Sequence, residues 1–452
     1  MQSVNPATGD VIREYDEDDD RAVDAKLTKA AAAFAVWSRR SFAERAQLMR
    51  HAAALLRERK PDWARLMTEE VGKTIGSSEA EAEKCAWVCD YYADNAERFL
   101  APEPVTTDAK ESLTRFDPLG PVLAVMPWNF PFWQVFRFAA PALMAGNVAL
   151  LKHASNVPGC ALAIEEVFRA AGFPDGAFQT LLVRAAAVSR IIRDPAIKAV
   201  TLTGSEPAGR EVAAQAGGAL KKTVLELGGS DPFIVLADAD AIATAPSAAR
   251  ARTINAGQSC IAAKRFIVEE PIADAFEAAL VRATAALCVG DPMDCTTDVG
   301  PLAREDLLRD LHDQVERSIR AGAKLLVGGH RLDRQGFFYA PTVLGGVVPG
   351  MPAFDEETFG PVAPVIRARD VEHAIELANR SRFGLGASLW TRDLERARAL
   401  VPRIEAGAVF VNGIVKSDPR LPFGGVKDSG YGRELATFGI REFVNIKAVW
   451  MG

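Results

Sequence analysis

Apolar residues are distributed along this chain in two different ways. Over residues 17–98 they recur at a roughly helical spacing, about 3.6 residues, within stretches rich in Ala, Leu, Glu and Arg. From residue 121 onward, short runs that are apolar throughout alternate with helical patterns such as 159–171 and 206–215; the runs are PVLAVM, NVALLK, KAVTLT, KTVLEL and PFIVLA. Such runs are typical of strands buried on both faces, and their alternation with helices predicts a parallel, doubly wound α/β sheet. A second alternating region follows over about 264–427.

Length and composition narrow the class of protein. A chain of 452 residues is long enough for two to four domains, and 49% hydrophobic with 25% charged residues is an ordinary globular mixture. The formal charge of -6 argues against nucleic acid as a partner. We expect no membrane association, because no apolar stretch approaches the roughly 20 residues of a membrane span. Without a signal-peptide pattern and with only six cysteines, a cytoplasmic location is expected.

Metal binding is not expected. Cys85 and Cys89 are four residues apart in a helical pattern, and no second Cys or His pair lies nearby to complete a zinc site. They are interpreted as packing residues. The five histidines form no HExxH-like cluster.

The segments that follow the predicted strands are the places to look for a site, because open α/β sheets bind ligands at the carboxyl ends of their strands. No GxGxxG fingerprint opens a helix anywhere in the chain. Gly204 and Ser205 instead precede a predicted helix with Pro207 at its second position. Ser205 is a candidate N-cap, and the free amides of that helix can hold a pyrophosphate, although a capped helix after a strand is also a common structural feature.

Three further residues are candidates for chemistry. Cys260 lies in the polar, glycine-containing stretch NAGQSCIAAKR, whereas a structural cysteine more often lies on an apolar face. Glu226 ends the run KTVLEL just before two glycines, where it can be a catalytic carboxylate or a solvated surface group. Asn129 in PWNFP can be a turn residue or an oxyanion donor.

Taken together, the motifs resemble the aldehyde dehydrogenase superfamily over nearly the whole chain. NPATG, PWNFP, APALMAGN, LLK, TGSEPAG, ELGGSDP, GQSCIAAKR, EETFGPV and LPFGGVKDSGYGRE occur in the family's order. The resemblance implies a Rossmann-like nucleotide-binding domain without the usual fingerprint, an α/β catalytic domain and a small β oligomerisation element. It also implies that Cys260 is the nucleophile and Glu226 the general base, and that Asn129 with the backbone N–H of Cys260 stabilises the oxyanion.

The resemblance also implies a set of cofactor contacts. Lys152 matches the lysine on the adenosine ribose, Ser205 the pyrophosphate contact, and Glu357 with Phe359 the contacts to the nicotinamide ribose. Where relatives that prefer NAD often carry a glutamate, this chain has Ser155, so NADP is the expected cofactor, with NAD the alternative. The full expected set is Pro127, Trp128, Lys152, Ser155, Gly204, Ser205, Gly209, Leu227, Glu357 and Phe359.

Within the superfamily the resemblance is closest to the succinate-semialdehyde dehydrogenases. Arg137 and Ser417 match the residues that hold the substrate carboxylate, and Ser259 beside the nucleophile is grouped with them. Longer relatives carry a second arginine where this chain has Ile254. Arg137 can alternatively form a structural salt bridge with a carboxylate of the protein. The alternative functions are oxidation of another short aldehyde or semialdehyde such as glutarate semialdehyde, acyl transfer to coenzyme A, and a catalytically silent nucleotide-binding scaffold.

The resemblance further implies a division into three parts. Residues 1–99 and 119–228 are expected to form the nucleotide-binding domain and residues 229–428 the catalytic domain. Residues 100–118 and 429–452, which include the strand-like runs ESLTRFDP and REFVNIKAVW, are expected to join subunits into a homodimer or homotetramer.

Overall fold

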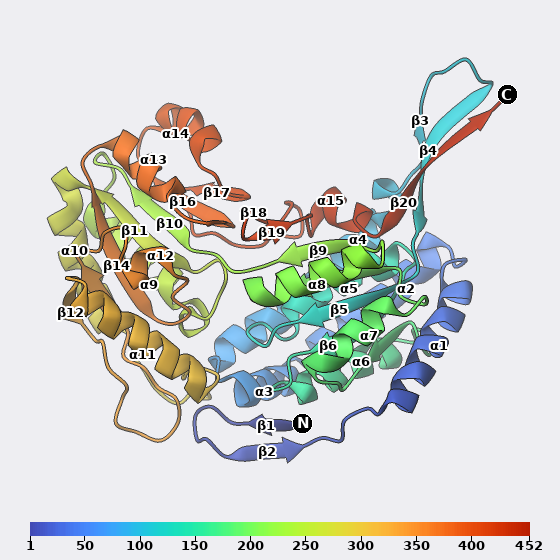
Figure 1. Ribbon diagram of the computed structural model, residues 1–452, viewed down its shortest axis with the longest axis horizontal. Coiled ribbons are helices and arrows are strands. Elements are labelled where there is room, and N and C mark those ends of the chain that lie inside the picture. The colour runs from blue at the N-terminus through green and yellow to red at the C-terminus, as the bar shows by residue number, and fades with distance from the viewer.

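A computed structural model describes residues 1–452. Figure 1 shows two α/β halves, each built around its own sheet, and a strand arm that projects from one of them and carries the C-terminus. A short antiparallel hairpin at the N-terminus consists of β1 (Gln2–Val4) and β2 (Val11–Glu14).

The first sheet has six strands in the order β19-β9-β8-β5-β6-β7. All neighbours pair in parallel except β19, which is antiparallel to β9. The bounds are β5 (Pro121–Met126), β6 (Val148–His153), β7 (Phe178–Thr180), β8 (Ala199–Thr203), β9 (Lys222–Glu226) and β19 (Gly430–Tyr431). The continuously apolar runs of the sequence are therefore strands of a largely parallel sheet, as predicted, because helices cover both faces.

Eight helices pack around this sheet. Asp19 caps α1 by accepting from the amide of Ala22, and Ser41 forms a capping box with Glu44 at the start of α2. The bounds are α1 (Asp20–Trp37), α2 (Phe42–Glu58), α3 (Lys60–Val71), α4 (Ile75–Phe99), α5 (Trp133–Met144), α6 (Pro158–Ala170), α7 (Val188–Arg193) and α8 (Glu206–Gly218). The predicted helical region 17–98 is confirmed.

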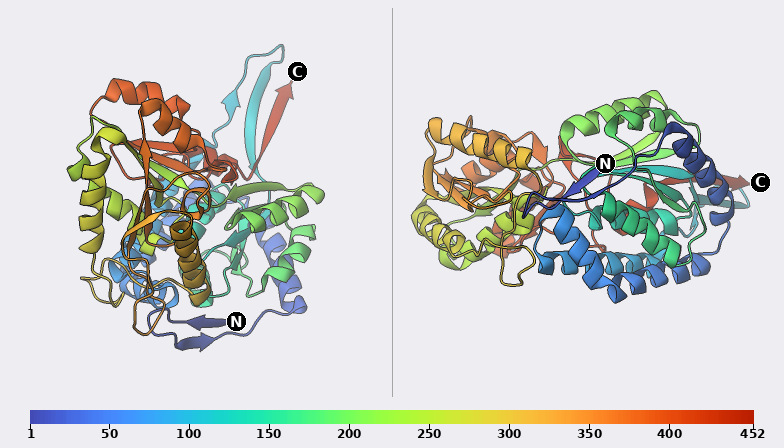
Figure 2. Two further views of the ribbon diagram at one scale, coloured as in Figure 1. Left: turned by 60° about the vertical axis from the view of Figure 1, so that its left-hand side comes forward. Right: turned by 90° about the horizontal axis from the view of Figure 1, so that it is seen from below.

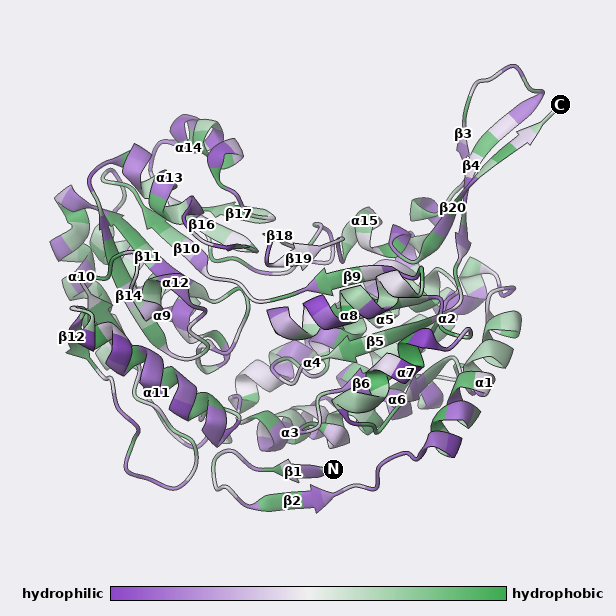
Figure 3. Cartoon of the chain, in the orientation of Figure 1, coloured by the Kyte–Doolittle hydropathy of each residue, from purple (hydrophilic) through white to green (hydrophobic).

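The second sheet has seven strands in the order β12-β13-β14-β11-β10-β16-β17, all parallel except β12. Its bounds are β10 (Asp231–Val235), β11 (Ala263–Glu269), β12 (Lys324–Val327), β13 (Thr342–Gly345), β14 (Val362–Ala368), β16 (Gly386–Trp390) and β17 (Ala408–Val411). The helices of this half are α9 (Ala241–Thr253), α10 (Glu270–Ala285), α11 (Glu305–Arg320), α12 (Pro352–Asp355), α13 (Val371–Asn379) and α14 (Leu394–Leu400). Figure 3 shows apolar strands inside both halves and hydrophilic residues along the outer face of α11.

The projecting arm is a three-stranded antiparallel sheet in the order β20-β4-β3. The strands are β3 (Glu103–Pro104), β4 (Glu111–Pro118) and β20 (Val444–Met451), and α15 (Ala436–Arg441) leads into β20. The left view of Figure 2 shows the arm projecting clear of both halves. The two predicted edge strands thus pair with each other, over eight residue positions. A small pair, β15 (Phe383–Gly384) with β18 (Val426–Lys427), completes the strands.

The two cysteines interpreted from the sequence as packing residues lie in the core. Cys85 and Cys89 are fully buried on α4, inside the larger hydrophobic cluster. None of the helices is both long and apolar enough to cross a lipid bilayer.

Candidate functional site

The segment before Cys260 has an unusual backbone. Where α9 ends, Asn255 (φ 52°) and Ala256 (φ 54°) adopt left-handed conformations, and Gly257 follows with φ 78°. Non-glycine residues in this region carry strain of about 1–3 kcal/mol each and often lie at functional sites. A side chain at Gly257 would meet the backbone of Gly360 at 2.3 Å, so only glycine fits there. The chain is thereby turned so that Cys260 emerges, half-buried, just before β11.

A small network of amides holds Asn129 against this turn. Asn129 follows β5 and is 5% exposed; its side-chain amide donates to the carbonyl of Gln258 at 3.0 Å. Asn255 donates to the backbone carbonyl of Asn129 at 2.7 Å. One amide hydrogen of Asn129 is thus used, and its second remains available. The backbone N–H of Cys260 donates no hydrogen bond within the protein. These are the two donors that the sequence predicted for an oxyanion.

Glu226 is a buried carboxylate whose oxygens accept no hydrogen bond from the protein. It ends β9 and is 2% exposed, and neither carboxylate oxygen has a hydrogen-bond partner. Burial raises the pKa of Glu226 to about 8, against the opposing effect of nearby Arg137. A side chain at Gly424 would come within 2.8 Å of this carboxylate, so a glycine leaves the space beside it open. A group of this kind destabilises the fold and is suited to accept a proton near neutral pH.

The thiol of Cys260 is not acidic by itself. Burial, with a smaller effect of Glu226, raises its pKa to about 12, against the opposing effects of Arg137 and Lys264. At neutral pH the thiolate is therefore scarce, and a base has to take the proton when the sulfur reacts. Because the charge of Glu226 acts on the thiol, the two groups are electrostatically linked.

Lys264 is a further residue of this site that the sequence did not reveal. It is 1% exposed on β11, and its ammonium donates to the carbonyls of Ser259 and Cys260, both at 2.8 Å. Its Nζ also lies 3.3 Å from a carboxylate oxygen of Glu357. Lys264 thus joins the loop that carries Cys260 to a predicted cofactor residue, Glu357. The signal in the sequence was a pair of basic residues, Lys264 and Arg265, at the start of a strand that continues with the apolar run FIV.

Several predicted cofactor residues lie at the carboxyl ends of neighbouring strands of the first sheet. Lys152 is near the end of β6 and 9% exposed, and its ammonium has no hydrogen bond or ion pair within the protein. Burial lowers its pKa. Ser155, two residues beyond the strand, is exposed. A buried ammonium without a partner is costly unless an anion joins it, so this position fits a phosphorylated ligand.

The start of α8 offers a second anion site of the same kind. Ser205 occupies the N-cap position, as predicted, but its side chain makes no capping hydrogen bond. The hydroxyl and the amides of the first turn are therefore free for a ligand. Close packing explains the glycine at position 209, because a side chain there would come within 2.5 Å of Leu227. Gly204 has room around it and links β8 to α8.

The remaining predicted cofactor residues lie where the two halves meet. Glu357 is half-buried and accepts from the amide of Gly229 at 3.1 Å. Phe359 meets Trp128 edge-to-face, with ring centroids 5.8 Å apart, and Pro127 immediately precedes Trp128. The Trp128 ring, which follows β5 of the first half, thus contacts Phe359 of the second half.

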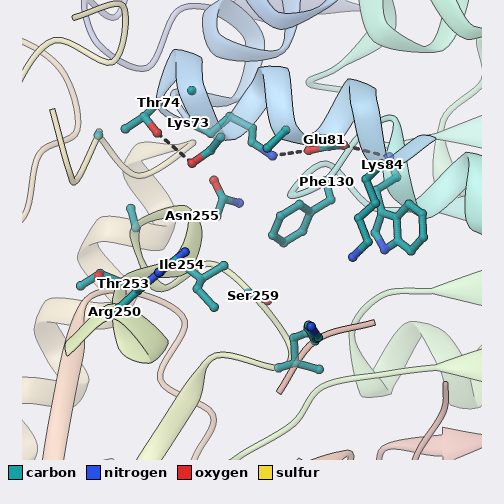
Figure 4. A pocket seen from close by; sticks show the side chains of 18 of the residues that line it. Lys73, Thr74, Glu81, Lys84, Phe130, Arg250, Thr253, Ile254, Asn255 and Ser259 are labelled. Atoms are coloured by element: carbon teal, nitrogen blue, oxygen red, sulfur yellow. Dashed lines mark hydrogen bonds and ion pairs between the residues drawn. The ribbon is translucent and has the colours of Figure 1, made fainter. Parts of the chain in front are cut away.

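Cys260 opens into a cavity of about 850 Å³ that lies between α4, α5 and the end of α9. Figure 4 shows Lys73, Glu81, Lys84 and Phe130 on one side of this cavity, with Ile254 and Ser259 across from them. Predicted substrate residues Arg137, Ser259 and Ser417 all line it. Ile254, where longer relatives carry arginine, presents an apolar side chain to the cavity.

Arg137 has a partner within the protein. Its guanidinium forms a buried ion pair with Glu434 and lies over the ring of Phe423 at 4.6 Å. It also donates to the hydroxyl of Thr203 at 3.3 Å. The structural salt bridge that the sequence left open as an alternative is therefore present. Arg137 nevertheless also lines the cavity.

The family assignment follows from comparison with known proteins. The model described as "Aldehyde dehydrogenase family" matches residues 1–449. The chain belongs to this family. A Synechocystis relative, "Probable succinate-semialdehyde dehydrogenase [NADP(+)]", is 56% identical over 100% of this chain and 99% of its own length. A Mycobacterium tuberculosis relative, "Succinate-semialdehyde dehydrogenase [NADP(+)] 1", is 54% identical over the same shares.

Solved structures of aldehyde dehydrogenases have the same fold. The succinic semialdehyde dehydrogenase of Streptococcus pyogenes, solved with NADP+, aligns with a TM-score of 0.97 at 38% identity and covers 100% of this chain and 99% of that one. The family and the fold predicted from the order of the motifs are thereby confirmed. The roles of the individual residues stay predictions that the geometry described above makes concrete.

Proposed function

We propose that this aldehyde dehydrogenase oxidises succinate semialdehyde to succinate, with NADP+ as the hydride acceptor. The observation that carries the chemistry is the pairing of a half-buried thiol, Cys260, with a buried carboxylate that has no hydrogen-bond partner, Glu226. The substrate and the cofactor are those named for the Synechocystis and M. tuberculosis relatives, which match along the full chain.

The first step is addition of the Cys260 sulfur to the aldehyde carbon, with loss of the thiol proton to a base. The carbonyl oxygen becomes an alkoxide, and two donors are placed to stabilise it: the free amide hydrogen of Asn129 and the backbone N–H of Cys260. Each donor in such an oxyanion hole contributes about 3–4 kcal/mol to the transition state. The network through Asn255 and Gln258 keeps Asn129 in place.

Collapse of the alkoxide breaks the C–H bond and leaves a thioester on Cys260. A bound NADP+ would supply the electrophilic carbon that accepts this hydride. Glu226 then removes a proton from water, which attacks the thioester carbonyl; the carboxylate product leaves and the sulfur recovers a proton. One aldehyde and one water thus become one carboxylic acid, with two electrons transferred.

Lys152 and Ser155 support NADP rather than NAD. The ammonium of Lys152 has no acidic partner in the protein, and Ser155 is exposed and uncharged. A 2′-phosphate on the adenosine ribose would therefore meet a cation and no repelling carboxylate. We propose that Ser205 and the start of α8 hold the pyrophosphate, with Gly204, Gly209 and Leu227 shaping the turn. Glu357 and Phe359, with Pro127 and Trp128, would enclose the nicotinamide riboside.

We also propose the assembly and the location. The division is a nucleotide-binding domain (1–99 and 119–228), a catalytic domain (229–428) and an oligomerisation element (100–118 and 429–452). The outer strand β20 has a free edge and exposes Ile446, Trp450 and Met451, which favours pairing with another copy in a homodimer or homotetramer. The enzyme is expected in the cytoplasm, acting on a small aldehyde.

The test is a panel of aldehydes assayed with each nucleotide. The purified enzyme should show its highest kcat/KM with succinate semialdehyde, above glutarate semialdehyde and butanal, and higher with NADP+ than with NAD+. The product should be the free acid, formed without coenzyme A. A preference for an uncharged aldehyde, or turnover only with coenzyme A, would contradict the proposal.

A further inference from the structure

Lys84 is the one partly buried cation of the substrate cavity that has no ion-pair partner; Arg250 and Lys416 also lack one, but both are exposed to solvent. Two other basic side chains of the lining are buried and neutralised: Lys73 by Glu81, and Arg137 by Glu434. Lys84 has no carboxylate within ion-pair distance, although it is only partly exposed. Figure 4 shows it projecting from α4 into the cavity, beside Phe130.

The surroundings of Lys84 hold its ammonium in place without neutralising it. Its Nζ lies 4.1 Å from the centre of the Trp133 ring and donates to the hydroxyl oxygen of Ser417 at 2.8 Å. The indole N–H of Trp133 donates to the same oxygen at 3.0 Å. Ser417 thus accepts twice, and its own O–H remains free to donate. Two N–H groups of Lys84 also remain free.

Free donors on Lys84 and Ser417 form an arrangement that suits a carboxylate. A carboxylate has two oxygens and only accepts hydrogen bonds, so it complements one ammonium and one hydroxyl. Arg137 is less suited to be the main source of charge, because Glu434 already offsets its guanidinium.

We infer that Lys84, with Ser417, binds the carboxylate of the substrate and is the residue by which this pocket selects a semialdehyde acid over an uncharged aldehyde. The inference rests on the proposed function and adds the group that sets its specificity. Lys84 lies on α4, in the N-terminal half of the chain, outside every motif that identifies the family.

The electrostatics of the free protein agree with this assignment. Burial, together with the charge of nearby Arg137, lowers the pKa of Lys84 to about 8. The acidic groups that act on it are held elsewhere, Glu81 by Lys73 and Asp418 by Arg420. The charged groups that act on Lys84 are Arg137 on α5, Glu81 on α4 and Asp418 beside Ser417; Cys85, also on α4, is a titratable neighbour whose pKa burial raises well above its ordinary value, so its thiol stays neutral. A bound carboxylate would raise the pKa of Lys84 and keep it charged.

The test compares Lys84→Met with Lys416→Met, a matched loss of an exposed cation from the same lining. Removing a charge-assisted hydrogen bond should lower kcat/KM for succinate semialdehyde by about 10- to 150-fold in Lys84→Met, mainly through KM. Butanal, an uncharged aldehyde of the same length, should lose less than about twofold. Lys416→Met should change both substrates by about twofold or less, because exposed charges are screened.

Wild-type enzyme provides a second measurement that needs no variant. KM for succinate semialdehyde should rise as the pH passes about 8 and Lys84 loses its proton, whereas KM for butanal should not. Equal losses on both aldehydes in Lys84→Met would assign Lys84 a structural role and overturn the inference, as would no loss on either. In both cases a wild-type preference for succinate semialdehyde would leave the proposed function intact. A wild type without that preference would contradict the proposed function itself, and this inference with it.

Discussion

Glu226 should make the enzyme less stable while making it active, and Glu226→Gln separates the two effects. Glutamine keeps the shape of the side chain and stays neutral at every pH. The native carboxylate is buried without a hydrogen-bond partner, and burial raises its pKa from 4.5 to about 8. Since the folded-state pKa lies above the unfolded one, the unfolded chain binds fewer protons between these values. Stability therefore falls as the pH rises from 4.5 and levels off above about 8.

The size of the effect follows from the same shift. Each pKa unit corresponds to about 1.4 kcal/mol, so ionised Glu226 lowers the free energy of unfolding by roughly 3 kcal/mol at pH 7 and about 5 kcal/mol above pH 8. For a chain of 452 residues, about 3 kcal/mol corresponds to a rise in Tm of roughly 3–4 °C in the glutamine variant at pH 7. Near pH 4.5 the two proteins should unfold at the same temperature.

The assay is thermal unfolding of both proteins from pH 4.5 to 9 at one protein concentration, beside rapid-mixing kinetics at pH 7.5. The variant should be increasingly more stable than the wild type as the pH rises. It should also give a burst of NADPH followed by slow turnover, because the thioester forms but is not hydrolysed. A Tm difference that is independent of pH would refute the reasoning about the buried charge. Loss of the burst would mean that Glu226 is needed to remove the thiol proton.

Three more outcomes are expected. Cys260→Ala should retain NADP+ binding in a fluorescence titration and lose both dehydrogenase and esterase activity; substantial residual turnover would rule out the thioester route. Ser155→Glu should weaken NADP+ far more than NAD+, because the new carboxylate repels the 2′-phosphate; equal Kd changes for the two nucleotides would show that this position does not face the phosphate. Arg137→Met should destabilise the fold by about 3–5 kcal/mol in denaturant unfolding, since it leaves Glu434 buried without its partner. Adding Glu434→Gln should recover most of that loss, and a double variant as unstable as the single one would show that the pair is not the cause.

The sequence by itself determined the class of fold and predicted which groups react. Apolar runs such as PVLAVM can be buried on both faces only as central strands, and they form β5 and its neighbours as predicted. Cys260 and Glu226 were candidates from their local surroundings, and the resemblance to the family gave them their predicted roles. The fold gives a local reason for these surroundings: Gly257 allows the left-handed turn, and the strand β9 ends at the glutamate. Signals of this kind lie within a few residues of the group that they position.

Only the tertiary structure decided which charges in the cavity are neutralised. Arg137 has the same neighbours in the sequence whether or not Glu434 reaches it, and the two are brought together by folding across nearly 300 residues. Lys84 and Ser417 are 333 positions apart, yet their side chains are hydrogen-bonded. Which long side chains on separate elements come into contact depends on how the helices and sheets pack. The periodicity of the sequence does not predict that packing, so it does not predict these contacts. The proposed catalytic groups could therefore be predicted from local motifs, whereas the partly buried Lys84 without an ion-pair partner became apparent only in the folded protein.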